Sequence, residues 1–269
     1  MDALDSGHVD GASVLIEMAM EAKSQGIPLE LSLLGHRDGN VIIASNDIAS
    51  PAQLKGKIIA IPNEQSSHNI LVQQLLNKYG MSEKDVTLVE MAPAEMPAGL
   101  KSGQIDGYCV AEPFGAKAVE TGVGHVLATS DELWENSICC GIVFNTQSTA
   151  GKQEALKTSI SLPSAGNSLT KDEAVQIAVN NLGQDEATSQ QSLQWISFND
   201  LSVTEEAYER LRRRLSSMPE RQPAHVRRVR GERLEGVCIV SKVLKGAVSF
   251  AALLAIWQVL AVSACFPRL

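Results

Sequence analysis

The strongest restriction on the fold of this chain comes from an eight-residue segment that occurs twice. Ser6–Ser13 reads SGHVDGAS, and Ser102–Cys109 reads SGQIDGYC. In each copy the glycine, Gly7 or Gly103, suits the position just after a helix, where positive φ is needed, and the apolar residue two positions on begins a strand. Two copies of one helix–glycine–strand junction predict two similar lobes rather than one sheet. Chance recurrence of a common junction is the alternative.

Strand-like apolar runs alternate with helical patterns at βαβ spacing through the first half of the chain. The spacing of Val14, Leu15, Met18 and Ala22 predicts a helix over Gly11–Gln25. The expected strands are 29–36, 41–45, 57–62, 86–91 and 105–110, and further helices are expected at 66–78, at 93–102 and after residue 204. This order predicts an α/β fold with parallel sheets that are covered on both faces.

Charge is distributed unevenly along the chain. Arg210–Lys245 carries a local charge of +8 and the remainder carries −16, within a net charge of −8. Nucleic-acid-binding proteins place positive charge on the folded domain, so this profile argues against a nucleic-acid partner.

Residues 246–266 then run for 21 positions without a charge, and as a helix they would span about 31 Å. We expect a transmembrane helix there; a buried core helix is the alternative.

Cysteine spacing and short motifs argue against several kinds of site. The five cysteines show no CxxC and no paired histidines at ligand spacing, so neither a disulfide framework nor a zinc site is expected. The adjacent pair Cys139-Cys140 is more typical of buried packing than of catalysis. No GxxxxGKS or GxxxxGKT motif occurs, so any ATPase is expected to be a separate chain. No cofactor is expected.

Several segments together resemble one known family. They are LDSGHVDGAS, GHRDGNVIIAS, SPAQLKGKIIAIP, SSHNILVQQLL, LKSGQIDGYCVAEPFGAKAV and ELWENSICCGIVF, and the tail SFNDLSVTEEAYERL is similar to the family's C-terminal helix. The family is that of the nitrate/sulfonate/bicarbonate solute-binding proteins of ABC importers, with their taurine-binding and THI5-like relatives. The resemblance covers most of the 269 residues.

The resemblance implies a two-lobed α/β fold of the periplasmic-binding-protein type, which closes on a small anionic or zwitterionic solute without catalysis. Lobe one would combine residues 1–46 with 141–217, and lobe two would be 47–140. The segment VIIAS would cross from lobe one to lobe two, and GIVFN would cross back. The implied partners are an ABC permease and a separate ATPase subunit.

Two departures from the family pattern define the alternatives. Relatives begin with a signal sequence, a strand, a helix and a second strand that have no counterpart here, so lobe one is expected to be incomplete. Residues 218–245 would form a basic linker, and 246–266 resemble the first transmembrane helix of a permease.

Relatives are extracytoplasmic, whereas the missing signal peptide and the positive-inside rule predict a cytoplasmic binding domain. The alternatives are an inactive binding-protein/permease fusion fragment and a THI5-like pyrimidine-precursor enzyme.

The main candidate for the solute site is the turn between a strand and a helix at residues 63–69. Backbone N–H groups at a helix N-terminus bind anions, Ser66 and Ser67 add hydroxyls, and His68 adds a ring N–H. By family placement this turn faces the cleft, and Ser13 would meet the ligand from lobe one. The alternative is that Ser66 or Ser67 only caps the helix and that His68 lies on the surface.

Three further residues are candidates on weaker grounds. Glu112 precedes a proline where relatives line the cleft; an acidic residue there suits a zwitterionic or protonated ligand, and a structural carboxylate is the alternative. His36 and Arg37 would supply a cation from lobe one, because a guanidinium grips an oxyanion with two parallel donors. A solvated turn is the alternative for that pair. Asp10 and Asp106 are interpreted as structural junction residues.

Overall fold

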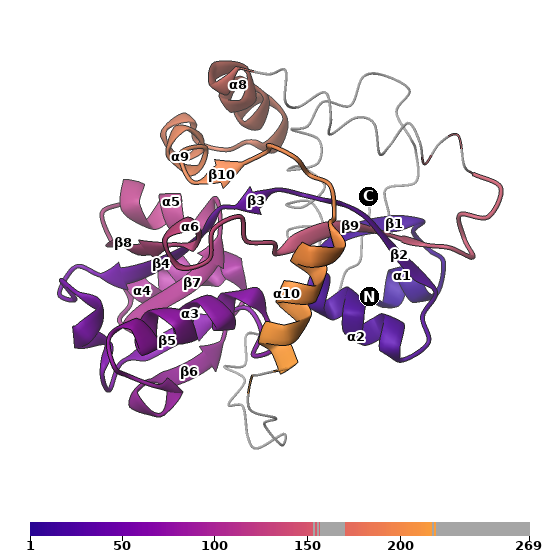
Figure 1. Ribbon diagram of the computed structural model, residues 1–269. Helices are drawn as coiled ribbons and strands as arrows, with labels where there is room; N and C mark the ends of the chain where they lie inside the picture. Colours follow the sequence, from indigo (N-terminus) through magenta and orange to yellow (C-terminus); the bar gives the residue numbers. More distant parts are fainter. Residues whose placement is uncertain (153, 155, 157–169, 217, 219–269) are drawn as a thin grey trace.

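The computed structural model describes residues 1–152, 154, 156, 170–216 and 218 (Figure 1). Its described strands form a five-stranded sheet, a three-stranded sheet and a two-stranded ribbon. The strands are β1 (Gly11–Leu15), β2 (Leu29–Leu34), β3 (Arg37–Asp38), β4 (Asn40–Ser45), β5 (Ile58–Ile61), β6 (Thr87–Glu90), β7 (Gly107–Ala111), β8 (Gly124–Thr129), β9 (Cys140–Asn145) and β10 (Ile196–Ser197).

The described helices cover and connect these sheets. The α-helices are α1 (Asp2–Asp5), α2 (Ile16–Ser24), α3 (Ser67–Lys78), α4 (Met96–Lys101), α5 (Phe114–Glu120), α6 (Ser130–Leu133), α8 (Lys171–Leu182), α9 (Glu186–Ser192) and α10 (Glu205–Ser216). Three short 3-10 helices are η1 (Pro51–Leu54), η2 (Glu83–Asp85) and η3 (Pro93–Glu95). The strands and helices predicted between residues 29 and 110 are therefore confirmed, with small shifts at their ends.

The five-stranded sheet has the order β6-β5-β7-β4-β8 and is covered on both faces. Alternate residues of β7 enter two different cores: Cys109 packs with Leu71 of α3, whereas Tyr108 and Val110 pack with Met96 of α4. Strand β5 runs parallel to β6 and β7, but β4 is antiparallel to both β7 and β8. The prediction of purely parallel sheets is therefore wrong, because β4 enters the sheet from the opposite direction.

The three-stranded sheet has the order β1-β9-β2, and β9 is antiparallel to both neighbours. The helix predicted over Gly11–Gln25 is wrong in its first part: Gly11–Leu15 form β1, and α2 begins only at Ile16. Helical spacing of the apolar residues continues into β1, but backbone pairing with β9 decides its structure. Ala19 and Ala22 then bury α2 against Leu29 and Val143 of this sheet.

The repeated segment has the same structure in both copies. A helix ends, Gly7 (φ +69°) or Gly103 (φ +73°) follows, and a strand begins four residues later, as β1 or β7. Each of these strands pairs with an antiparallel strand, β9 for β1 and β4 for β7. The prediction of two similar α/β units is confirmed at this level, whereas the residue boundaries of the lobes stay a prediction.

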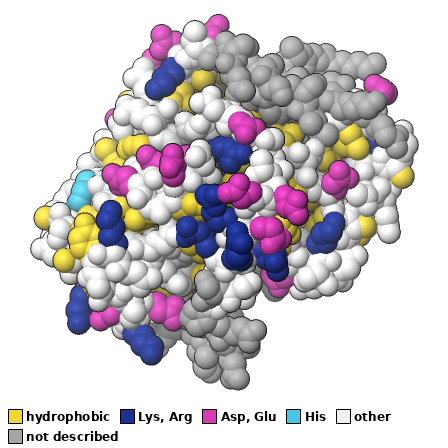
Figure 2. All heavy atoms as spheres, in the orientation of Figure 1, with side chains coloured by type: hydrophobic (Ala, Val, Ile, Leu, Met, Phe, Trp, Pro, Cys, Tyr) yellow, Lys and Arg dark blue, Asp and Glu magenta, His cyan; other side chains and the backbone are white. Residues whose placement is uncertain are grey.

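Segments late in the chain hold the two sheets together. Strand β10 pairs with β3, next to β4, and α9 packs against α5. Helix α10 runs across the space between the sheets (Figure 1), with Arg214 4.6 Å from the ring centre of Trp134. On its outer side basic and acidic side chains alternate (Figure 2), as in the pair Arg210–Glu206 at 2.8 Å.

No helix in the described part of the chain is long and apolar enough to cross a membrane. The transmembrane helix predicted at 246–266 and all but one residue of the linker predicted at 218–245 lie outside the described residues.

Candidate functional site

Helix α3 begins in the way that the turn at residues 63–69 predicts. Ser66 is the N-cap: its Oγ accepts a hydrogen bond from Asn69 N (3.3 Å) and donates one to Asn63 O (2.5 Å). Ser67 and His68, the first two helical residues, are buried rather than exposed. Ser66 is therefore a cap, and the N-terminus of α3 points its next free N–H group into the interior.

That N–H group is bound by a carboxylate of α2, the helix that packs on the three-stranded sheet. The sequence did not identify this residue. The backbone N–H of Ser67 donates a short hydrogen bond to Glu17 Oε1. Glu17 lies in the first turn of α2, is 5% exposed, and thus joins the N-terminal ends of α2 and α3. Burial raises the pKa of Glu17 from 4.5 to about 7, although its hydrogen bonds to backbone N–H groups oppose this shift.

Buried polar atoms without a hydrogen-bond partner occur at this contact, on Glu17, Ser67 and His68, and also elsewhere in the protein. Within the described residues there are six such atoms, and they belong to five side chains: Glu17 Oε2, Ser67 Oγ, His68 Nδ1, Asn40 Oδ1 and Nδ2, and Glu112 Oε1. Asn40 opens β4 on the same face as Ile42, the face that α3 covers. Because buried polar groups are normally paired, the unpaired atoms at the start of α3 favour a ligand site there.

Two cysteines complete the inner end of the site. Cys139 Sγ lies 3.9 Å from His68 Nε2 and 3.6 Å from Cys140 Sγ, and both cysteines are buried. Contact with Cys140, followed by burial, raises the pKa of the Cys139 thiol well above its ordinary value. A thiol held in its protonated form is a poor nucleophile, which fits the packing role expected for this pair.

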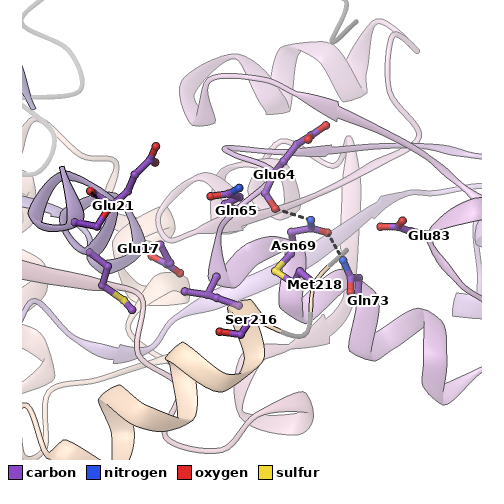
Figure 3. A pocket seen from close by; sticks show the side chains of 12 residues that line it. Glu17, Glu21, Glu64, Gln65, Asn69, Gln73, Glu83, Ser216 and Met218 are labelled. Atoms are coloured by element: carbon purple, nitrogen blue, oxygen red, sulfur yellow. Dashed lines mark hydrogen bonds between the residues drawn. The ribbon is translucent and has the colours of Figure 1, made fainter. Parts of the chain in front are cut away.

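A cleft of about 520 Å³ opens from Glu17 between α2 and α3. We call it the α2–α3 cleft. In Figure 3, Glu17 and Glu21 on α2 lie across it from Asn69 and Gln73 on α3. Its described lining is Glu17, Met20, Glu21, Ser24, Glu64, Gln65, Asn69, Gln73, Glu83, Leu215, Ser216 and Met218.

Glu112 does not join this group of residues. Its Oε2 accepts hydrogen bonds from Ala116 N (3.1 Å) in α5 and from Ser192 Oγ (2.8 Å) in α9, on the sheet face opposite α3. Burial raises its pKa from 4.5 to about 7, and the two hydrogen bonds and nearby His36 oppose the shift. The neighbouring cavity measures about 30 Å³. These contacts favour the structural interpretation of Glu112.

The candidates predicted from the first lobe are also spread out. Arg37 is buried and donates two hydrogen bonds to backbone oxygens, from Nε to Asp200 O (2.6 Å) and from a terminal nitrogen to Ser202 O (2.9 Å). These bonds hold the segment before α10 in place. His36 Nδ1 contacts Asp38 O at 2.8 Å. Ser13 lies in β1 opposite Ile142. A role of these three residues in binding stays a prediction, and the contacts of Arg37 favour a structural one.

Comparison with known proteins gives a consistent picture. The NMT1-like family matches residues 1–182. The chain is 31% identical over 156 residues to the bicarbonate transport ATP-binding protein of Synechocystis sp., which covers 51% of this chain and 23% of that protein. It is 29% identical over 157 residues to the nitrate/nitrite binding protein of Synechococcus elongatus, covering 49% of this chain and 35% of the relative. The chain thus spans well under half the length of these relatives.

The fold is similar to that of a solved protein, the ligand binding component of an ABC-type import system from Staphylococcus aureus with zinc bound. The TM-score is 0.74 at 30% identity, over 80% of this chain and 76% of that one. Among the described residues of the present chain, no group of three or more His, Cys, Asp or Glu could hold a metal ion.

Proposed function

This chain belongs to the NMT1-like family, and on that premise we propose that it is the solute-binding component of an ABC import system. Its two-sheet α/β fold, similar to that of a known ligand-binding component, supports the proposal. The observation that carries it is the contact between Glu17 and Ser67. A binding protein of this kind holds its ligand between two halves, and here the N-terminal ends of α2 and α3 meet beside a cleft that the buried Glu17 lines.

Binding accounts for this site better than catalysis does. A covalent mechanism needs a nucleophile next to a base that a third group orients. The nearest arrangement in the described site is Cys139 with His68 at 3.9 Å, where the thiol is buried and its pKa is raised. The second ring nitrogen of His68 has no hydrogen-bond partner that would orient it. The proposal therefore includes no catalytic step and no cofactor.

The proposed partners are an ABC permease and a separate ATPase subunit, and the names of the relatives, which include a bicarbonate transport ATP-binding protein, support a place in such a system. The names of the relatives put nitrate, nitrite and bicarbonate among the first solutes to test. Sulfonates and taurine join them from the resemblance of the sequence.

As the alternative, we propose that residues 246–266 attach the chain to a membrane, with the binding domain on the cytoplasmic side because the basic block precedes them. In that orientation the domain would not meet extracellular solute, and the chain would be an inactive binding-protein/permease fusion fragment. Protease added outside intact cells tests this alternative: protection of residues 1–217 supports it, and cleavage there supports a working receptor instead.

Thermal unfolding of the full chain in mild nonionic detergent tests the proposed function. The panel consists of nitrate, nitrite, bicarbonate, methanesulfonate, taurine and small organic cations, each compared with sodium chloride of equal ionic strength. At least one solute is expected to raise the Tm, since a ligand at a hundred times its Kd stabilises the folded state by about 2.7 kcal/mol. If no solute in the panel changes the Tm, the proposal is contradicted.

A further inference from the structure

Glu112 connects α5, which packs on the five-stranded sheet, to α9, a helix that follows much later in the chain (Figure 1). One carboxyl oxygen of this buried residue, Oε2, lies 3.1 Å from Ala116 N in α5 and 2.8 Å from Ser192 Oγ in α9. The chain continues from α9 into β10, which pairs with β3 just ahead of β4. The contact therefore holds the α9–β10 segment, residues 186–197, beside the crossing where the chain passes from one sheet to the other.

The hydroxyl group of Ser192 indicates which protonation state of Glu112 this contact favours. Ser192 Oγ lies 2.8 Å from Glu112 Oε2 and also 2.8 Å from Thr188 O. A serine hydroxyl has one proton to donate and two lone pairs that accept. If Glu112 is ionised, both neighbours are acceptors and compete for that single proton. If Glu112 is protonated, Ser192 donates to Thr188 O and accepts from Glu112, so both contacts are hydrogen bonds.

The surroundings of Glu112 also favour its neutral form. The side chain is 3% exposed, and its second oxygen, Oε1, has no hydrogen-bond partner among protein atoms. Glu112 lines a cavity of about 30 Å³ whose apolar surface comes from Pro113, Ala174, Ala178, Leu182, Leu193 and Ile196. A charge in such surroundings is costly, and burial accordingly raises the pKa of Glu112 from 4.5 to about 7.

The charged groups around Glu112 differ in their effect. His36, held by the contact of its Nδ1 with Asp38 O, favours the ionised form of Glu112. From β7, the hydroxyl of Tyr108 donates to Phe114 O, and burial followed by the charge of Glu112 raises its pKa, so it stays neutral. The ionisable side chains of α5, α8 and α9 are exposed: Lys117, Glu120, Lys171, Asp172, Glu173 and Glu186.

We propose that Glu112 is a proton-dependent latch: in its protonated form it donates a hydrogen bond to Ser192 and holds the α9–β10 segment on α5, and in its ionised form it releases that segment. Since β10 pairs with β3, release also loosens the crossing between the two sheets. Attachment should be strongest at low pH and should weaken as the pH rises towards about 7, because the attached form binds the proton more tightly. The latch does not depend on the identity of the solute.

Hydrogen–deuterium exchange of the full chain in mild nonionic detergent tests the latch. Glu112→Gln copies the protonated carboxyl, because its amide keeps an oxygen for Ala116 N–H and adds an N–H donor for Ser192 Oγ. Wild type and variant are compared at equal pH, so the pH dependence of intrinsic exchange cancels. The protection of α9 amides in the wild type, relative to the variant, is expected to fall about tenfold or more between pH 5 and pH 8, and the relative protection of α3 amides is expected to stay constant. A relative protection of α9 that does not change with pH would overturn the inference and leave the proposed function standing.

Two serine variants test the direction of the hydrogen bond. Ser192→Ala should lower the protection of α9 about fivefold at pH 5, where protonated Glu112 loses its acceptor, and less at pH 8. The matched control is Ser189→Ala, a buried serine of the same helix whose Oγ donates to Asp185 O (2.9 Å), and its effect should be equal at the two pH values. A larger effect of Ser192→Ala at pH 8 than at pH 5 would mean that Ser192 donates to an ionised Glu112, which contradicts the latch. This comparison also decides the question should Glu112→Gln fail to fold.

Discussion

Glu17 combines properties that rarely occur together in one side chain. It is buried, it lies between two helix N-termini that favour its ionised form, and its pKa is nevertheless raised to about 7 because burial dominates. A carboxyl group with a higher pKa in the folded protein than in the unfolded chain makes stability depend on pH in a defined direction.

The direction in which stability changes with pH follows from the proton that Glu17 binds in the folded protein. Between pH 4.5 and about 7 the folded protein holds a proton on Glu17 that the unfolded chain has lost. The contribution of Glu17 to stability is therefore complete below about pH 4.5 and is lost as the pH rises to about 7, a change of up to about 3 kcal/mol. Glu17→Gln cannot titrate, so the Tm of the wild type should fall relative to that of this variant between pH 5 and pH 8. A constant difference in Tm across that range would contradict the assignment.

Arg37 offers a second prediction about a single residue. Replacing Arg37 by Met removes both hydrogen bonds to the carbonyl oxygens of Asp200 and Ser202, and it should lower the free energy of unfolding in urea by about 2 kcal/mol. The control Arg210→Met breaks only an exposed ion pair on α10 and should have a much smaller effect. Equal losses in the two variants would show that the contacts of Arg37 contribute little. Loss of the response to solute at unchanged stability would instead indicate a binding role.

At the scale of elements, the two copies of the repeated segment share backbone structure but differ in how their aspartates are used. Asp106 accepts a hydrogen bond from Ile58 N (2.8 Å) and one from Lys57 Nζ (3.1 Å), so it ties β5 to the start of β7. Asp10, at the matching position, pairs with Lys152 at 2.7 Å on the surface. The same sequence junction thus carries a strand-to-strand contact in one sheet and only an exposed ion pair in the other.

This difference gives a matched experiment. Asp106→Ala leaves the Ile58 N–H without its acceptor and should cost about 1–3 kcal/mol in denaturant unfolding. Asp10→Ala removes an exposed pair and should cost under about 1 kcal/mol. The assignment of Asp106 is wrong if the Asp10 variant is the less stable of the two.

The sequence predicted helices and strands well where the spacing of apolar residues agrees with the strand pairing in the structure. It failed where the two conflict. Apolar runs such as the one in β5 are buried on both faces and are unambiguous. At β1 the helical spacing of Val14 and Leu15 was misleading, because only the partner strand β9 makes that segment extended. For the site, the turn at Ser66 was predicted from its capping residues. Glu17 was missed because nothing near it in the sequence shows that α3 lies opposite.

At the scale of the whole molecule, the two sheets are linked in several distinct ways. The chain passes from one sheet to the other before β4 and returns at β9, and α10 packs across both. The Glu17–Ser67 hydrogen bond links α2 directly to α3, and the contact between His68 and Cys139 links α3 to the residue just before β9. These two links, together with the apolar contacts that α10 makes with both halves, must break if the sheets move apart.

The reactivity of Cys139 should therefore report how often the two sheets separate. While the sheets are together its thiol is 1% exposed and held protonated, and once they separate it meets solvent and an alkylating reagent can trap it. Cys109, buried within the five-stranded sheet, should react only when that sheet unfolds. Peptide mass analysis of the two labelling rates would then count openings per unit time, and solute should slow the Cys139 rate alone. Identical rates at the two cysteines would mean that the halves come apart only when the protein unfolds.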